Sequence, residues 1–339
     1  MRQRSKGERI IENVVVFTNP NSANQKDSEE FIDKLNKLQN KNEFNLYVQN
    51  NPVNDETFNH IFKKFVPKKT LIGPCGGDGT VHDVVNKYLE YKYNESNKDE
   101  IDPILTIISA GGSNDTASQL HPVPWARKSP QKHLDSPAPY YRPLMIEISK
   151  GDYSKKIAAV SYFSIGLTSL LAKDYNSEEF RSSVANKNPK LKRLYQGLEI
   201  PKYLHKSQPF ILEDQFGPRV LYDLIFPNGS RMAGGAIQFS STDLLKKEYG
   251  RLEVKSLTVP SVIKNMGKSV LGIYQQYGPD DKQEFIVKSL DESPIIIQAD
   301  GEDYSIPSGS KVIINLGKVG LRLVSTRLFI PSEQLAKAA

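Results

Sequence analysis

Two hydrophobic periods alternate along the first 120 residues. Short apolar runs predict buried strands, and stretches with an apolar residue every three or four positions predict amphipathic helices. The predicted strands are residues 14–18, 44–48, 69–73 and 104–108. The predicted helices centre on residues 31–38, 58–65 and 81–89. This strand–helix rhythm predicts a parallel sheet covered by helices, which is an α/β domain.

The pattern changes near Leu120. Residues 121–143 hold six prolines without periodicity, which predicts a linker or an irregular loop. Beyond them, short apolar runs separated by turn residues predict an antiparallel β domain, with a sandwich as the expected form. Its predicted strands are residues 144–148, 157–163, 221–226, 236–239, 252–254, 285–287, 295–298, 312–316 and 321–324.

The Gly-Gly-Asp-Gly-Thr turn at residues 76–80 is the most informative segment. It lies between a predicted strand and a predicted helix. Its glycines let the backbone approach a ligand, and the helix start adds N–H groups and the positive end of its dipole. This combination predicts a phosphate site. Asp78 would repel a phosphate unless a cation such as Mg²⁺ lies between them or its charge is used in chemistry.

Neighbouring residues narrow the type of turn. No Gly-Lys-Ser/Thr ends it, so it is not a Walker A loop, and His82 stands where a dinucleotide fingerprint needs a third glycine. Thr80 followed by Asp83 predicts a capping box at the helix start.

Composition adds little to this picture. The 339 residues are enough for two domains, and 38% hydrophobic and 25% charged residues are ordinary for a globular protein. A net charge of +6 favours an anionic partner only weakly, and a solvated basic surface explains it equally well. Cys75 is the only cysteine, so no intramolecular disulfide forms, and we therefore expect a cytoplasmic protein. We also expect Cys75 to be a small buried residue. The five histidines show no metal-ligand spacing, which argues against zinc.

Membrane contact, if any, is predicted to be peripheral. No run approaches the 18 or more apolar residues of a spanning helix. The basic N-terminus is followed by too short an apolar stretch for a secretory signal. Residues 191–198 form a basic amphipathic stretch, for which a surface helix is the favoured interpretation and membrane contact the alternative.

Four motifs occur in a fixed order along the chain: Asn19-Pro20-Asn21-Ser22, the turn at 76–80, Gly111-Gly112-Ser113-Asn114-Asp115, and Asp300-Gly301-Glu302. Together they resemble the diacylglycerol kinase catalytic family, which includes sphingosine kinases and small bacterial lipid kinases. The resemblance implies an α/β nucleotide-binding domain, a β-sandwich lipid-substrate domain, and an active site in the cleft between them. We therefore expect these domains in residues 1–143 and 144–310, with residues 311–339 returning to the first domain.

The resemblance also implies a reaction, the ATP- and Mg²⁺-dependent phosphorylation of a lipid hydroxyl. The residues that it assigns to the nucleotide are Asn19, Asn21, Ser22, Gly76, Gly77, Asp78, Gly79, Thr80, Gly111, Asn114 and Asp115. It assigns catalysis and Mg²⁺ to Asp78, Asp300 and Glu302, without deciding which carboxylate takes the proton. The expected partners are a lipid substrate and a membrane surface but no nucleic acid; the oligomeric state stays open, with a homodimer as one option.

Departures from the family pattern limit the resemblance. Gly112 replaces the usual threonine of the second nucleotide loop, and Ala23 replaces a glycine of the first. The family's Asp-Asp-Gly, associated with metal, matches Glu248-Tyr249-Gly250, where Tyr249 supplies no carboxylate. Thr168 stands where many members carry an acid, which favours a neutral, diacylglycerol-like acceptor over a sphingoid base.

Three alternatives remain. NAD kinases also carry Gly-Gly-Asp-Gly-Thr on a similar two-domain plan and would phosphorylate a dinucleotide. A sphingoid base is the second alternative acceptor. A regulatory or lipid-binding member with weakened catalysis is the third, motivated by Gly112 and Tyr249 and opposed by the retained carboxylates.

Overall fold

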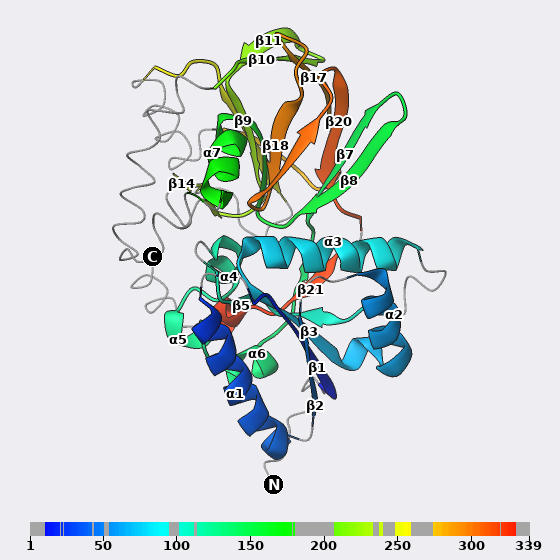
Figure 1. The fold of residues 1–339 in the computed structure, drawn as a ribbon, viewed down its shortest axis with the longest axis vertical. Helices are drawn as coiled ribbons and strands as arrows, with labels where there is room; N and C mark the ends of the chain where they lie inside the picture. The colour runs from blue at the N-terminus through cyan, green and yellow to red at the C-terminus, as the bar shows by residue number, and fades with distance from the viewer. Residues whose placement is uncertain are drawn as a thin grey trace. The chain divides into compact units, whose positions relative to one another are not determined.

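A computed structural model describes two compact parts of this chain (Figure 1). The described residues are 11–20, 22, 24–42, 44–50, 54–94, 102–111, 114–177, 179, 207–232, 237–239, 248–258, 274–318 and 320–329. Unit 1 comprises residues 1–141 and 321–339, and unit 2 comprises residues 142–320. The chain thus re-enters unit 1 after residue 320, whereas the expected boundary was residue 310.

Unit 1 contains a mixed sheet in the order β2-β1-β3-β4-β21-β6, and β5 pairs with the far end of β3. Strands β1 to β5 and β21 pair in parallel, and β6 is antiparallel to β21. The strands are β1 (Asn13–Thr18), β2 (Asn45–Asn50), β3 (Thr70–Gly76), β4 (Ile104–Leu105), β5 (Ile108–Ser109), β6 (Tyr140–Tyr141) and β21 (Leu321–Leu323). The predicted α/β class is confirmed.

Helices cover both faces of this sheet (Figure 1). They are α1 (Gln25–Asn42), α2 (Asp55–Lys64), α3 (Asp78–Asn94), α4 (Asp115–Leu120), α5 (Pro124–Arg127) and α6 (Pro130–Asp135), with 3₁₀ turns η1 (Pro67–Lys69) and η2 (Thr326–Phe329). Helix α1 packs with α6, and α2 with α3. The apolar face predicted for α3 is buried as expected: Val81, Val84, Val85, Tyr88 and Leu89 are all nearly inaccessible.

Unit 2 contains two six-stranded antiparallel sheets, in the orders β11-β10-β17-β20-β7-β8 and β16-β15-β12-β9-β18-β19. Their inner faces share one hydrophobic core, so the predicted β-sandwich is confirmed. The strands are β7 (Leu144–Lys150), β8 (Tyr153–Ala159), β9 (Tyr162–Gly166), β10 (Phe210–Asp214), β11 (Gly217–Leu221), β12 (Asp223–Pro227), β15 (Tyr249–Val254), β16 (Gln275–Tyr277), β17 (Gln283–Ser289), β18 (Ile295–Ala299), β19 (Glu302–Ile306) and β20 (Ser310–Leu316). The small pair β13 (Arg231–Met232) and β14 (Ile237–Gln238) and helix α7 (Leu167–Asn176) complete it.

Several local predictions were wrong. Residues 121–143 are not a plain loop, because they contain α5, α6 and β6. The expected strand 157–163 is two strands, β8 and β9, separated by Val160 and Ser161, and the expected strand 104–108 is likewise split into β4 and β5. The amphipathic stretch 191–198 lies outside the described residues.

Candidate functional site

Three loops of unit 1 leave the same edge of its parallel sheet. Thr18 at the end of β1 lies opposite Cys75, and Gly76 at the end of β3 lies opposite Ser109 of β5. Because these strands run in the same direction, the segments that follow them emerge side by side, where ligands of open α/β sheets bind. The structure thus brings together the three nucleotide motifs that the sequence predicts for this unit.

Glycine is required where two of these loops meet. A Cβ on Gly111 would lie 2.1 Å from the Cα of Gly77, and a Cβ on Gly76 would lie 2.3 Å from Oγ1 of Thr80. The backbone N–H of Ala110 donates to the carbonyl of Gly76 at 3.0 Å. Backbone therefore packs directly on backbone at Gly111, where a side chain would separate the two loops, whereas a side chain at Gly76 would clash with the Thr80 side chain of its own loop.

Helix α3 begins at Asp78, earlier than the capping box predicted. Thr80 consequently lies inside the first turn and is not the N-cap, so the predicted capping box with Asp83 is wrong. Its hydroxyl instead accepts a hydrogen bond of 3.3 Å from Nδ2 of Asn19, which connects the first loop to the second. In an α-helix the first N–H groups have no acceptor one turn earlier, and the dipole is positive there. The start of α3 is therefore suited to a phosphate.

Asp78 joins the second loop to the third. Its Oδ2 accepts the backbone N–H of Asp115 at 3.1 Å and its Oδ1 accepts that of Thr116 at 3.3 Å. These are the first two residues of α4, so the carboxylate caps that helix from another segment. Asn114, which precedes α4, adopts a left-handed conformation with φ 53° and makes no side-chain cap of its own. Asp78 therefore has a positioning role that its residue type alone does not reveal.

The third loop is closed by asparagine side chains. Oδ1 of Asn114 accepts the backbone N–H of Gly111 at 2.8 Å, and Nδ2 of Asn114 donates to the carbonyl of Gly111. Nδ2 of Asn24 donates to the same carbonyl at 2.9 Å, and its backbone N–H donates to Ala110 at 3.1 Å. Sequence reasoning missed Asn24. Only its place in a turn next to the first motif could have indicated it.

The first loop supplies one further candidate ligand. The backbone N–H of Ser22 donates to the carbonyl of Asn19 at 3.0 Å, which closes a turn. The Ser22 hydroxyl is buried and has no hydrogen-bond partner among the residues that the structure describes. It could therefore donate to a phosphate oxygen. Asn21 and Gly112 lie outside the described residues.

In unit 2, Asp300 and Gly301 form a two-residue hairpin turn between β18 and β19, and Glu302 directly follows it. Asp300 and Gly301 both have positive φ, 50° and 96°, and Ala299 pairs with Glu302, as in the Asp-Gly turns that favour tight hairpins. Asp300 is nevertheless only 1% exposed. Its carboxylate accepts the backbone N–H groups of residues 160, 161 and 162 at 2.5, 2.7 and 3.2 Å. Glu302 is half-buried at the start of β19.

Two positions noted as departures have clear structural roles. Tyr249 is buried in β15, and its hydroxyl donates to the carbonyl of Asp281 at 3.1 Å. Thr168 lies in the first turn of α7 and donates its backbone N–H, at 3.2 Å, and its hydroxyl to the carboxylate of Asp223. Complete burial raises the pKa of Asp223 to about 7. The absence of an acid at position 168 therefore does not leave this region without a carboxylate.

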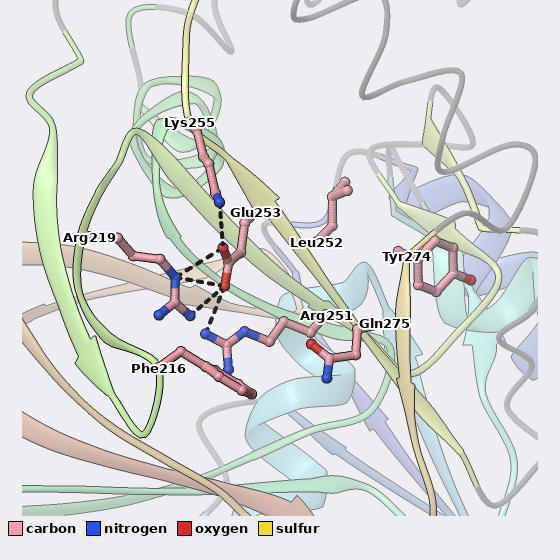
Figure 2. Close-up of a pocket in the computed structure, with 8 residues that line it drawn as sticks. All are labelled: Phe216, Arg219, Arg251, Leu252, Glu253, Lys255, Tyr274 and Gln275. Atoms are coloured by element: carbon pink, nitrogen blue, oxygen red, sulfur yellow. Dashed lines mark hydrogen bonds and ion pairs between the residues drawn. The ribbon is translucent and has the colours of Figure 1, made fainter.

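A cavity of about 330 Å³ in unit 2 contains none of the predicted site residues (Figure 2). Its lining includes Arg219, Arg251 and Glu253, and in an ion-pair cluster the two arginines each contact Glu253 and the neighbouring Asp214 at 2.7–2.8 Å. The two arginines hold the pKa of the Asp214 carboxyl well below its usual range. Because both guanidinium charges are already neutralised, the cavity offers little to an anion apart from the exposed Lys255. We assign the cluster to stability.

Cys75 is buried, as predicted, and burial raises the pKa of its thiol to about 11. It is thus a poor nucleophile at neutral pH. In the described residues no helix is long and apolar enough to cross a membrane.

The comparisons with known proteins agree with the motifs. Residues 13–136 match the model of the diacylglycerol kinase catalytic domain. This segment is therefore similar to the catalytic domain of that family. It covers all three nucleotide loops of unit 1, so the expected resemblance is confirmed there.

Solved structures show the same fold. A structure of a diacylglycerol kinase from Bacillus anthracis str. Sterne is similar with a TM-score of 0.58 and 16% identity, over 94% of this chain and 99% of that one. A second structure from this organism, described as a candidate diacylglycerol kinase, has a TM-score of 0.58 and 18% identity, over 94% and 99% of the two chains. At this identity the likeness concerns the fold. A comparison with curated proteins found no match.

Proposed function

We propose that this chain is a kinase that transfers the γ-phosphate of ATP to the hydroxyl of a lipid, with a diacylglycerol-like acceptor favoured. One observation carries the proposal: three interlocked loops, two of which contain glycine, lie at the carboxyl edge of the parallel sheet within the segment that matches the diacylglycerol kinase catalytic domain. Backbone N–H groups at a helix start are the donors that nucleotide phosphates need. The comparisons support a kinase; the lipid acceptor is our inference.

The loops would act by positioning the nucleotide. Phosphoryl transfer depends mainly on orientation and on stabilising charge rather than on covalent steps by the protein. The start of α3 would receive phosphate oxygens, and the Ser22 hydroxyl would add a donor. Asp78 and the asparagines hold the loops at fixed separations, so the phosphate chain meets a preformed surface.

Of the three predicted carboxylates, we propose Asp78 for the Mg²⁺ ion expected with ATP. In the described residues no cluster of three or more His, Cys, Asp or Glu side chains is placed to hold a metal. Mg²⁺ in kinases is usually held by one or two carboxylates together with phosphate oxygens and water. Asp78 lies at the start of α3, and a carboxylate oxygen that accepts an N–H group can also contact a cation. When bound, Mg²⁺ would neutralise charge on the phosphates.

Asp300 does not fit a metal or a proton, because three backbone donors occupy its inaccessible carboxylate. We therefore propose Glu302 as the group that accepts the proton of the lipid hydroxyl. Its partial exposure leaves it accessible to substrate. General-base groups of this kind typically contribute at least about a hundredfold to the rate.

An acceptor survey tests the proposal. The purified chain would be incubated with ATP labelled at the γ-phosphate, Mg²⁺ and, in separate tubes, diacylglycerol micelles, sphingosine micelles and NAD. We expect label in the diacylglycerol product and none in NAD. Label in NAD alone would establish the NAD kinase alternative, and label in sphingosine alone would establish the sphingoid-base alternative. ATP binding without transfer to any acceptor would favour the regulatory alternative.

A further inference from the structure

The carboxylate of Asp300 is directed away from the hairpin turn that carries it and into the connection between β8 and β9. That connection consists of Val160 and Ser161. The two carboxylate oxygens accept the N–H groups of Val160, Ser161 and Tyr162, and the Asp300 N–H donates to the Tyr162 carbonyl at 3.1 Å. Four hydrogen bonds therefore join one turn residue to three consecutive residues of another segment.

The same connection is held from its carbonyl side. Nδ2 of Asn228 donates to the carbonyl of Val160 at 3.1 Å, and the N–H groups of Asn228 and Gly229 both donate to the carbonyl of Ser161 at 2.8 Å. Asn228 is completely buried. Because the N–H and carbonyl groups of the β8–β9 connection are both hydrogen-bonded, this connection is a rigid support for the hairpin turn attached to it.

Glu302 is attached to this support through the hairpin turn and one strand pair. It directly follows the Asp300-Gly301 turn and pairs with Ala299, which in turn pairs with Phe163 of β9. The backbone position of Glu302 is therefore set by the contact between Asp300 and the β8–β9 connection. An inaccessible carboxylate that accepts three N–H groups is poorly suited to proton transfer, but it can hold the turn that precedes Glu302 in place.

We infer that Asp300 is a positioning residue that fixes Glu302, the proposed proton acceptor, for catalysis. This inference rests on the proposed function for the role of Glu302. The contact between Asp300 and residues 160–162 is independent of it. The inference gives different roles to Asp300 and Glu302, two carboxylates that the sequence alone does not distinguish.

Three variants and one control test the inference. Asp300→Asn puts an amide NH₂ where a carboxylate oxygen now accepts backbone N–H groups. Glu302→Gln removes only the charge of the proposed base. Gly301→Ala leaves both carboxylates intact but strains the turn, since Gly301 has φ 96°, although a Cβ there would meet no atom within 4 Å. Asp303→Asn changes a carboxylate at the adjacent position of β19.

The kinetic readout is the dependence of kcat on pH with a lipid acceptor. We expect Glu302→Gln to lower kcat about a hundredfold or more and to abolish the acid limb of the profile, with the KM for ATP unchanged. Asp300→Asn should lower kcat to a similar extent, because a displacement of the Glu302 carboxylate by about 1 Å is enough to slow the reaction by this factor. It should leave the acid limb of the profile at its original pH. Gly301→Ala should lower kcat by a smaller factor, and Asp303→Asn should have no effect. Loss of the acid limb in Asp300→Asn, with its retention in Glu302→Gln, would overturn the inference.

A spectroscopic readout keeps the test valid if no acceptor is phosphorylated. In protein labelled with ¹³C at glutamate carboxyl carbons, the signal absent from Glu302→Gln identifies Glu302. Asp300→Asn and Gly301→Ala should shift that signal and accelerate amide exchange at residues 160–162, whereas Asp303→Asn should not accelerate exchange there. An unchanged Glu302 signal in Asp300→Asn would refute the positioning role. Absence of phosphoryl transfer by the wild type would refute the proposed function instead.

Discussion

Replacing Gly111 with alanine should separate the two glycine-containing loops of unit 1. A Cβ at this position would lie 2.1 Å from the Cα of Gly77 and 2.8 Å from its N. Carbon atoms in contact lie about 3.5–4.0 Å apart, so the loops would have to move apart by roughly 1.5 Å. Both clashing atoms belong to the backbone, so no side-chain rotation relieves the contact.

The expected consequence is loss of nucleotide positioning with little loss of fold. Misplacement of reacting groups by about 1 Å costs on the order of a hundredfold in rate. The variant should therefore show weaker ATP binding by titration calorimetry and about a hundredfold lower kcat/KM for ATP. Its circular dichroism spectrum should match that of the wild type, because Gly77 and Gly111 both lie outside the helices and strands.

Gly278→Ala is the matched control. The nearest atom to a Cβ at Gly278 is Oδ2 of Asp281 at 3.5 Å, an ordinary contact. This variant should bind ATP and turn over as the wild type does. Wild-type ATP affinity and turnover in Gly111→Ala would show that the close approach of the two loops has no part in nucleotide binding.

Three further predictions concern other parts of the chain. Asp78→Asn should loosen the start of α4 and lower kcat about a hundredfold, whereas Asp83→Asn, at an exposed position of the same helix, should leave steady-state kinetics unchanged. Arg251→Met should lower the free energy of unfolding, measured by urea denaturation, by about 3–5 kcal/mol, because it leaves the carboxylate of Asp214 buried with one cation fewer. A loss below about 1 kcal/mol, which is typical of exposed ion pairs, would contradict the assignment of the cluster to stability. The pKa of the Asp223 carboxyl is about 7 in the folded chain and about 3.9 in the unfolded chain, so the folded state binds the carboxyl proton more tightly. The resulting stabilisation is fully present below about pH 4 and is lost as the pH rises to about 7. Thermal melts from pH 4 to pH 8 should show this decline in the wild type and a shallower one in Asp223→Asn; parallel curves would contradict it.

The sequence is sufficient to predict the sheet of unit 1 and the loops at its edge. Strand and helix periods there are regular, and parallel strands necessarily bring their following turns to one edge. Glycines clustered after two of these strands, at residues 76–79 and at 111, are typical of turns that approach a ligand or another backbone segment. The start of α3 was misplaced because Thr80 and Asp83 satisfy the local pattern of a capping box, while the helix actually begins at Asp78.

The roles of the carboxylates could not be predicted in the same way. Asp78 accepts N–H groups from residues 37 and 38 positions away, and Asp300 from residues 138 to 140 positions away. Residue type shows that a carboxylate is present, but only tertiary structure shows what occupies its lone pairs. An Asp-Gly hairpin turn predicts an exposed aspartate, and the structure buries this one.

Strands β10 and β11 were missed for a related reason. Asp214 and Arg219 interrupt the apolar pattern, and in sequence they are typical of an exposed turn. In the structure they are joined to Arg251 and Glu253 in a cluster that shields all four charges. A buried ion-pair cluster cannot be recognised until its partners on other strands are known.

The most direct test of the central claim is the chemical identity of the product. The chain would be incubated with ATP, Mg²⁺ and a short-chain diacylglycerol in detergent micelles, and the lipid fraction analysed by mass spectrometry beside Glu302→Gln and a reaction containing excess EDTA. We predict one phosphate added to the lipid for each ADP formed, with both the variant and the EDTA reaction reduced at least about a hundredfold. ADP formation without any phosphorylated lipid, or lipid phosphorylation at the wild-type rate by Glu302→Gln, would contradict the account.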